Sequence, residues 1–324
     1  MEQRETADCA AAGDEPESGT EARALAATLE RAVWEALGNE HHSGVGGKAS
    51  SLDNDSLCLV RPVPAVGGEL RFYRGMPQPF RPHSHDFLVI GLVAEGERLL
   101  VCNGESRLIA PGDLIVFGPG DVHGCRQQGE APFSYISITA SPCFLTAAKL
   151  RGPVVRDAGA ARRFAALVRR LLGVANDGEG PANALASLLE CLAGAELSKL
   201  PDSSMGMTAV HDAAARRAEA LLRESLLESV DLRTMAAQEG ISEYALIRAY
   251  RRRYSITPIQ HLISLRTERA CGLLAAGELP AEAAREAGFA DQAHLTRAFK
   301  QRVGTTPAAY RKMVHGKGSK EPLQ

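Results

Sequence analysis

Two stretches in the last hundred residues repeat one pattern of small, apolar and basic residues. The first copy contains Ala236 and Gly240, and the second contains Ala284 and Gly288. In each copy the Gly is followed by an apolar residue, a basic amphipathic segment and a Thr-Pro pair. A small Ala lets two helices approach closely, and a Gly permits a sharp turn between them. The repeat therefore predicts two helix-turn-helix units, which are typical of proteins that read duplex DNA.

The second helix of each unit is the predicted recognition helix. Ser242 and Asp291 are suitable N-caps, because their side-chain oxygens can accept a free backbone N–H. Helix-turn-helix proteins contact bases mainly from the start of this helix, where Arg reads guanine and Gln reads adenine. The predicted DNA-binding residues are Tyr244, Ile247, Arg248, Arg251, Gln292, His294, Thr296, Arg297 and Lys300. The flanking basic residues expected to contact phosphate are Arg252, Arg253, Lys300 and Arg302.

Residues from Pro258 to about Ala276 form a predicted amphipathic helix between the two units. Such a helix could place both recognition helices in successive major grooves, about 34 Å apart. The inward-facing residues at spacing four are Leu246 with Tyr250, and Leu295 with Phe299. This arrangement predicts one DNA-binding domain that carries both units.

Charge divides the chain in the same place. Residues 216–324 hold 18 Lys and Arg against 12 Asp and Glu, a net charge of +6, whereas the whole chain carries −2 and residues 1–215 therefore −8. A basic half that coincides with the repeat supports a nucleic-acid partner. The seven Cys form no C-x-x-C pair, no apolar run is long enough to span a bilayer, and no secretion signal begins the chain. These features predict a cytoplasmic location and no membrane partner.

The N-terminal half reads as strands followed by helices. Residues 1–50 are acidic and Ala-rich and are expected to be flexible, apart from a short helix over Thr20–Leu37. Short strands with turn residues, including the hairpin signal Asn103-Gly104, fill residues 57–139 and predict a sandwich or small barrel. Residues 158–196 carry Leu-rich stripes typical of a helical hairpin, whose stripes either pack in the core or form a dimer interface. Residues 201–215 are the expected linker.

The C-terminal hundred residues resemble the DNA-binding domain of the AraC/XylS family of bacterial transcription regulators. The resemblance covers residues 217–312 and is most specific over Glu286–Lys300, Gly304–Pro307 and Tyr310-Arg311. Two departures affect the first unit: Ile247 is apolar where a polar base reader is common, and Ser255 stands where the second copy has Gly304. The resemblance implies a regulator that binds promoter or operator DNA, with RNA polymerase as a further partner.

The same resemblance extends to residues 57–140, which look like the cupin-type ligand-binding barrel of many such regulators. The segments that carry it include Pro82–Asp86, Pro111–Leu114 and Pro119–His123. It implies an effector site with Tyr73, His83, His85 and His123. A purely structural hydrogen-bonding role is the alternative for the three His residues. Metal cupins also carry a Glu four or five residues after the second His, where Val89 and Ile90 stand here. We therefore expect no metal and no cofactor, although His83, His85 and His123 could supply three imidazole ligands.

Together these observations predict an α+β, multidomain chain: a cupin-like β-barrel (51–145), a helical hairpin (146–200) and an all-α double helix-turn-helix domain (216–315). Residues 1–50 and 316–324 are the expected N-terminal segment and tail. The expected function is a homodimeric, AraC-type transcription regulator controlled by a small-molecule effector in the barrel, and not an enzyme; the sequence leaves open whether it is an activator or a repressor. The alternatives are a metal-dependent cupin enzyme fused to a DNA-binding module, and a constitutive architectural DNA binder.

Overall fold

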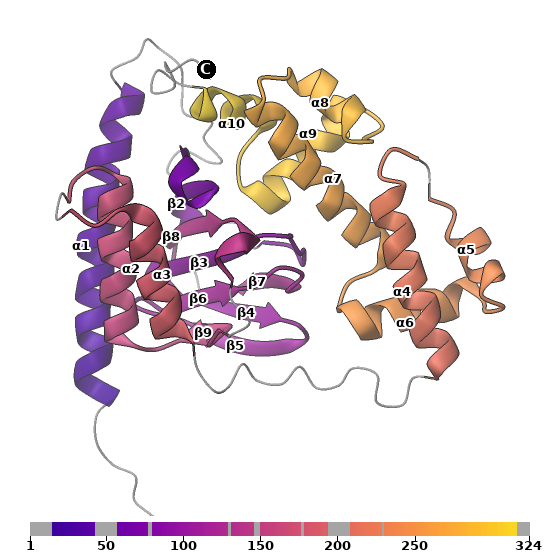
Figure 1. Cartoon of the computed structure of the whole chain (residues 1–324), viewed down its shortest axis with the longest axis horizontal. Helices are drawn as coiled ribbons and strands as arrows, with labels where there is room; N and C mark the ends of the chain where they lie inside the picture. The colour runs from indigo at the N-terminus through magenta and orange to yellow at the C-terminus, as the bar shows by residue number, and fades with distance from the viewer. Residues whose placement is uncertain are drawn as a thin grey trace, which may run out of the picture.

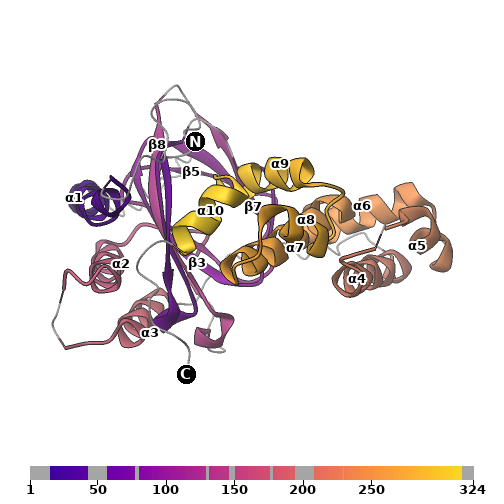
Figure 2. The ribbon, with the colours of Figure 1, turned by 90° about the horizontal axis from the view of Figure 1, so that it is seen from above.

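The computed structural model describes residues 15–42, 57–76, 80–128, 131–145, 150–175, 178–193, 208–228 and 230–315. Three groups of elements lie side by side (Figure 1). Helices α1 to α3 cover one side of a β-barrel, and helices α4 to α10 lie on its other side; the view from above shows the same order (Figure 2). No helix within these ranges is long and apolar enough to cross a membrane.

Two antiparallel sheets form the barrel, as the many short strands of the sequence predicted. One sheet has the order β1-β2-β8-β3-β6-β9 and the other β5-β4-β7. The strands are β1 (Leu57–Val63), β2 (Gly68–Met76), β3 (Leu88–Glu95), β4 (Arg98–Cys102), β5 (Glu105–Ile109), β6 (Leu114–Phe117), β7 (His123–Gln127), β8 (Phe133–Ala140) and β9 (Val154–Val155), with short 3-10 helices at Pro64–Val66 and Pro142–Phe144.

The predicted hairpin at Asn103-Gly104 joins β4 to β5, with Cys102 opposite Glu105. Asn103 has φ +50° and Gly104 has φ +89°. Both values lie in the left-handed region that Asn and Gly tolerate, which explains why this dipeptide closes a two-residue turn. Asn103 also accepts the backbone N–H of Val122 and donates to Asp121, so the turn is fixed to the segment that leads into β7.

The first helical layer comprises α1 (Glu15–His42), α2 (Ala158–Leu171) and α3 (Pro181–Leu192). Its apolar stripes pack with one face of the larger sheet in a single core: Leu29 is 1% exposed, and Phe164, Leu188 and Leu192 are fully buried. The predicted hairpin is confirmed, and its stripes lie in the core of this chain. The helix predicted over Thr20–Leu37 is confirmed and is longer than expected, because α1 also includes part of the flanks that were expected to be flexible. Leu29 and Val33 of this helix are buried against the barrel; the rest of residues 1–50 lies outside the described residues.

The second helical group contains α4 (Ala209–Glu224), α5 (Leu232–Gln238), α6 (Glu243–Tyr254), α7 (Pro258–Ala275), α8 (Pro280–Glu286), α9 (Gln292–Val303) and α10 (Pro307–Val314). The predicted caps are present: Ser242 accepts the backbone N–H of Ala245, and Asp291 accepts that of His294. The turn glycines Gly240 and Gly288 have φ +67° and +83°. Helix-turn-helix units α5–α6 and α8–α9 therefore form as the repeat predicted.

The boundary predicted between linker and DNA-binding domain needs correction. Helix α4 begins at Ala209, and its residues Ala214 and Ala215 are buried in the core of the first unit with Leu246 and Tyr250. The predicted linker 201–215 thus contains the first turns of a packed helix, and the domain starts before residue 216. Its remaining residues, 201–207, lie outside the described residues.

Candidate functional site

The two recognition helices, α6 and α9, expose five of the nine side chains that were predicted to contact DNA. Tyr244 is 70% exposed, and Arg248, Arg251, Gln292 and Arg297 are exposed as well. Ile247, His294, Thr296 and Lys300 are half-buried. The inward pairs Leu246 with Tyr250 and Leu295 with Phe299 are fully buried, and they fix which side of each helix faces outward.

Within each helix the exposed face is held in place by local contacts. The guanidinium of Arg248 lies 5.8 Å from the centroid of the Tyr244 ring, so these two candidate readers share one side of α6. On α9, the Thr296 hydroxyl donates to the carbonyl of Gln292 at 2.8 Å. Thr296 therefore offers a base its methyl group and its hydroxyl lone pairs. Both helices present polar groups at their N-terminal ends, where groove-reading helices contact bases.

Two of the arginines expected to contact phosphate do not point outward. Arg253 donates to Asp212 of α4 at 2.6 Å, which satisfies its charge inside the domain. Arg302 is only 9% exposed and lies against the barrel. Both residues fall three positions after an inward-facing aromatic residue, Tyr250 or Phe299, which places them on the inner side of their helices. Their prediction as phosphate contacts is wrong for this arrangement.

The four predicted effector-binding residues line one cavity inside the barrel. The cavity measures about 70 Å³, and Tyr73, His83, His85 and His123 all contribute to its wall. The imidazole centroids are 4.4 Å apart for His83 and His123 and 4.8 Å for His85 and His123. His123 stacks on Phe117 and His85 on Phe87, with centroids 3.9 and 4.2 Å apart. The sequence did not single out the aromatic wall of Phe80, Phe87, Phe117 and Tyr135, because in a strand pattern an aromatic residue reads as core.

Each of the three imidazoles forms a hydrogen bond with a backbone carbonyl through its Nδ1 atom. The acceptors are Arg81, Phe87 and Asp121, at 2.8, 2.8 and 3.0 Å from His83, His85 and His123. A carbonyl oxygen only accepts, so a neutral ring must carry its proton on Nδ1, which leaves Nε2 as an acceptor. Within the described residues no group of three or more His, Cys, Asp or Glu has the geometry to hold a metal ion.

Burial keeps these imidazoles neutral. It lowers the pKa of His83 and His85 well below the ordinary value, with a smaller contribution from the neighbouring imidazoles, and it lowers the pKa of His123 to about 4. In the unfolded chain each imidazole takes up a proton at about pH 6.5. Above pH 6.5 the imidazoles are neutral in both states and the free energy of unfolding is unaffected by their titration. As the pH falls from 6.5 toward 4, the unfolded chain takes up protons that the folded barrel does not, so the free energy of unfolding falls.

We expect the free energy of urea unfolding of the barrel to fall between pH 7.5 and pH 5. His123 alone accounts for about 2 kcal/mol of this fall. Trp34 is the single Trp of the chain and packs against the barrel core. Its fluorescence therefore reports urea unfolding of this part of the molecule. A His123→Phe variant keeps a ring on Phe117 and should show a smaller fall. An equal fall in variant and wild type would contradict this account.

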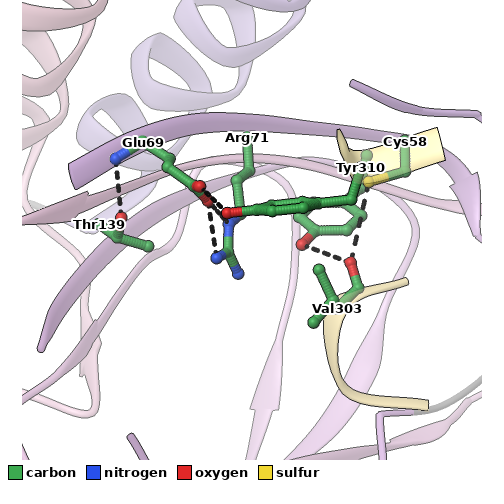
Figure 3. A network of polar contacts seen from close by, with 7 residues as sticks. Cys58, Glu69, Arg71, Thr139, Val303 and Tyr310 are labelled. Atoms are coloured by element: carbon green, nitrogen blue, oxygen red, sulfur yellow. Dashed lines mark hydrogen bonds and ion pairs between the residues drawn. The ribbon is translucent and has the colours of Figure 1, made fainter. Parts of the chain in front are cut away.

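The cavity wall is connected to the second recognition helix by a polar network (Figure 3). The Tyr73 hydroxyl donates to the carbonyl of Val303, at the end of α9, at 3.1 Å. Tyr310 of α10 donates to the Glu69 carboxylate, which also pairs with Arg71 at 2.8 Å. Tyr73 therefore contributes its ring to the cavity, while its hydroxyl is engaged with the DNA-binding domain.

A second contact joins the barrel to the first unit. Arg223 of α4 forms an ion pair with Asp86, in the loop that follows His85. Its Nη2 lies 3.1 Å from Oδ1 of Asp86. The hydrogen bonds that Arg223 donates to the Asp86 carboxylate raise the pKa of its guanidinium above the usual range. The DNA-binding domain thus contacts the barrel through both of its units, close to the residues that line the cavity.

Comparisons with known proteins agree with this division of the chain. A family model described as a helix-turn-helix domain matches residues 235–313, and one described as an AraC-like ligand binding domain matches residues 66–192. The HTH-type transcriptional regulator YbfI of Bacillus subtilis (strain 168) is 30% identical over 238 residues, which cover 69% of this chain and 84% of YbfI. The MmsAB operon regulatory protein of Pseudomonas aeruginosa is 29% identical over 119 residues, or 36% of each chain.

Among solved structures, ToxT from Vibrio cholerae O395 is similar, with a TM-score of 0.49 and 14% identity, over 76% of this chain and 98% of ToxT. The ligand-binding model spans both the barrel and helices α2 and α3. The matched residues, 66–192, therefore include both the barrel strands and the helices that share one hydrophobic core with them. The sequence analysis had placed a domain boundary between these two parts at residue 145.

Proposed function

Because this chain belongs to the AraC/XylS family of transcription regulators, we propose that its base contacts come from the exposed N-terminal parts of α6 and α9. The chain is an AraC-type DNA-binding regulator with an N-terminal ligand-binding domain. The observation that carries the assignment of residues is the exposure of Tyr244, Arg248, Gln292 and Arg297 beside fully buried inward pairs. Helix α7 has 18 residues and is about 27 Å long, which suits two recognition helices in successive major grooves.

The proposed effector site is the cavity lined by His83, His85 and His123, with the ring of Tyr73. A ligand there acts on DNA binding through its different affinity for two arrangements of the domains. The contacts Tyr73–Val303, Glu69–Tyr310 and Asp86–Arg223 are the groups that such a rearrangement would alter. The barrel is a binding module and not an enzyme in this proposal, which Val89 and Ile90, at the positions of the cupin Glu, support.

The partners in this proposal are promoter DNA, RNA polymerase and a second copy of the chain. A transcription regulator acts where the bacterial chromosome lies, so the proposal includes a cytoplasmic location. The Leu-rich stripes of α2 and α3 are occupied inside the chain, so a homodimer would use the outer faces of these helices or another surface.

Replacing Arg297 by Ala tests the base-reading assignment. The expected loss on the operator is about 1–3 kcal/mol, together with relaxed specificity at one base position. The matched variant is Lys300→Ala on the same helix, which should weaken the operator and random duplex alike, because a phosphate contact carries no sequence information. Both affinities are measured by fluorescence anisotropy at fixed salt concentration.

Equal losses on the operator and on random duplex for Arg297→Ala would remove its base-reading role. A loss confined to the operator for Lys300→Ala would remove the phosphate assignment. If wild type itself shows no preference for any duplex, the architectural alternative replaces sequence-specific regulation.

A further inference from the structure

The cavity in the barrel has an unusual balance of charge. Two arginines, Arg71 and Arg302, are among its lining residues, and no Asp or Glu is. The three lining imidazoles are neutral because burial lowers their pKa. Most of the remaining wall is aromatic or aliphatic. A cavity of this composition complements a ligand that is mainly apolar and carries a negative charge.

The charge of Arg71 is satisfied within the protein. Its guanidinium pairs with the Glu69 carboxylate at 2.8 Å through both Nε and Nη2. Glu69 is held in turn by the Tyr310 hydroxyl, and its backbone N–H donates to Thr139 Oγ1. Arg71 is therefore part of the structural network of Figure 3 and brings little free positive charge to the cavity.

The charge of Arg302 is not satisfied. The side chain is more than nine-tenths buried, and its single hydrogen bond within the described residues runs from Nε to Ser264 Oγ at 3.5 Å. No carboxylate of the described residues forms an ion pair with it. Burial lowers its pKa to about 10, so Arg302 remains a cation at neutral pH. The Nη atoms of Arg302 are not among the fully buried unpaired nitrogens of the described residues, and Arg302 lines the cavity, so an anion in the cavity could pair with its guanidinium.

The internal repeat supplies a control within the same molecule. Arg253 occupies the corresponding position of α6, and Asp212 lies 2.6 Å from its guanidinium. The first unit thus gives this arginine a carboxylate from its own domain, whereas the second unit turns Arg302 toward the barrel cavity. The missing carboxylate is the group that a ligand would provide.

The imidazoles add an acceptor surface to this site. His85 Nε2 is buried and has no hydrogen-bond partner within the described residues, and the ring is held by its Nδ1 bond to Phe87. A ligand hydroxyl could donate to it. The cavity of about 70 Å³ has room for only a few non-hydrogen atoms, since a single water needs ~10–15 Å³.

We propose that the effector is a small carboxylate, of about the size of a short-chain acid, whose anionic end is bound by Arg302 of the DNA-binding domain while its apolar part contacts the aromatic wall of the barrel. This inference rests on the proposed effector site. It makes Arg302 a specificity-determining residue and places one end of the ligand on the second recognition helix. The ligand therefore contacts both domains at once, so its binding and the docking of α9 depend on each other.

The test is isothermal titration of the full chain with a panel of short acids: acetate, propionate, butyrate and 3-hydroxybutyrate. The controls are the matched neutral amides and inorganic phosphate. We expect at least one short acid to bind and its amide to bind at least tenfold more weakly. Arg302→Gln should weaken the acid at least tenfold and leave the amide unchanged, and Arg302→Lys should restore part of the difference. Arg285→Gln removes one charge from α8, none of whose residues lines the cavity, and should leave acid binding unchanged.

Several outcomes would overturn the carboxylate assignment: no acid of the panel binds, acid and amide bind equally, phosphate binds as well as the best acid, or Arg302→Gln binds the acid like wild type. Operator binding is measured on the same samples. A chain that binds the operator but no acid refutes this inference alone, and a chain that binds the acid but no operator refutes the proposed DNA readers while the anion site stands. Trp34 fluorescence shows that the barrel of each variant has folded, and circular dichroism at 222 nm shows the same for the helical DNA-binding domain.

Discussion

Replacing Gly288 by Ala is expected to destabilise the DNA-binding domain by about 2–5 kcal/mol and to abolish operator binding. Gly288 has φ +83°, and a Cβ there would lie 2.3 Å from the carbonyl oxygen of Leu226. That carbonyl accepts a hydrogen bond from Arg266 Nε at 2.7 Å. Ala at this position therefore adds the cost of a left-handed residue, about 1–2 kcal/mol, to the cost of displacing packed backbone, about 1–3 kcal/mol.

The corresponding glycine of the first unit is the matched control. Gly240 has φ +67°, but nothing lies within 4 Å of the Cβ position. Gly240→Ala should therefore cost only the left-handed term, about 1–2 kcal/mol. Urea unfolding followed by circular dichroism at 222 nm measures both variants. Equal losses in the two variants would show that packing of the second turn against Leu226 contributes nothing.

Replacing Phe164 by Ala is expected to cost about 3–5 kcal/mol and to destabilise barrel and helices together. Phe164 on α2 is fully buried in the core that joins α1, α2 and α3 to the sheet. Removing a buried ring leaves a cavity that this packed core cannot close. Trp34 belongs to the same core. We therefore expect Trp34 fluorescence and the circular dichroism of the barrel strands to follow one unfolding transition, shifted to lower urea concentration.

Arg169→Ala is the control for Phe164→Ala, since Arg169 is exposed on the same helix and surface changes usually stay within ~0.5 kcal/mol. Trp34 fluorescence could instead change at a lower urea concentration while the barrel strands unfold at the wild-type midpoint. That result would show that the helical layer is a separate unit. That result would favour the boundary at residue 145 that the sequence suggested.

The sequence predicted the features of this fold that depend on local chemistry. Ser242, Asp291, Gly240 and Gly288 were identified as caps and turn residues because each acts on backbone groups within a few positions. The inward pairs were found for the same reason, since helical spacing alone determines a face. The three barrel histidines were brought together by their resemblance to a known barrel, and the structure places them on one cavity.

Features that depend on contacts between distant segments could not be read in this way. The burial of Leu29 and Val33 on α1 requires the sheet that they cover. Arg302 was expected at the DNA backbone because it lies in a basic helix, yet it follows Leu295 and Phe299 at spacings of seven and three. Helical periodicity therefore did contain a signal that Arg302 faces inward, and only the barrel explains what it faces.

The most direct test of the central claim is selection of binding sites by the full chain from a library of random duplexes. The two recognition helices joined by α7 predict enrichment of one motif with two half-sites about one helical turn apart, 10–10.5 base pairs from centre to centre. The pool selected with Arg297→Ala should lose information in one half-site only. A pool without any enriched motif, or one with a single undivided site that Arg297→Ala leaves unchanged, would contradict readout by two units.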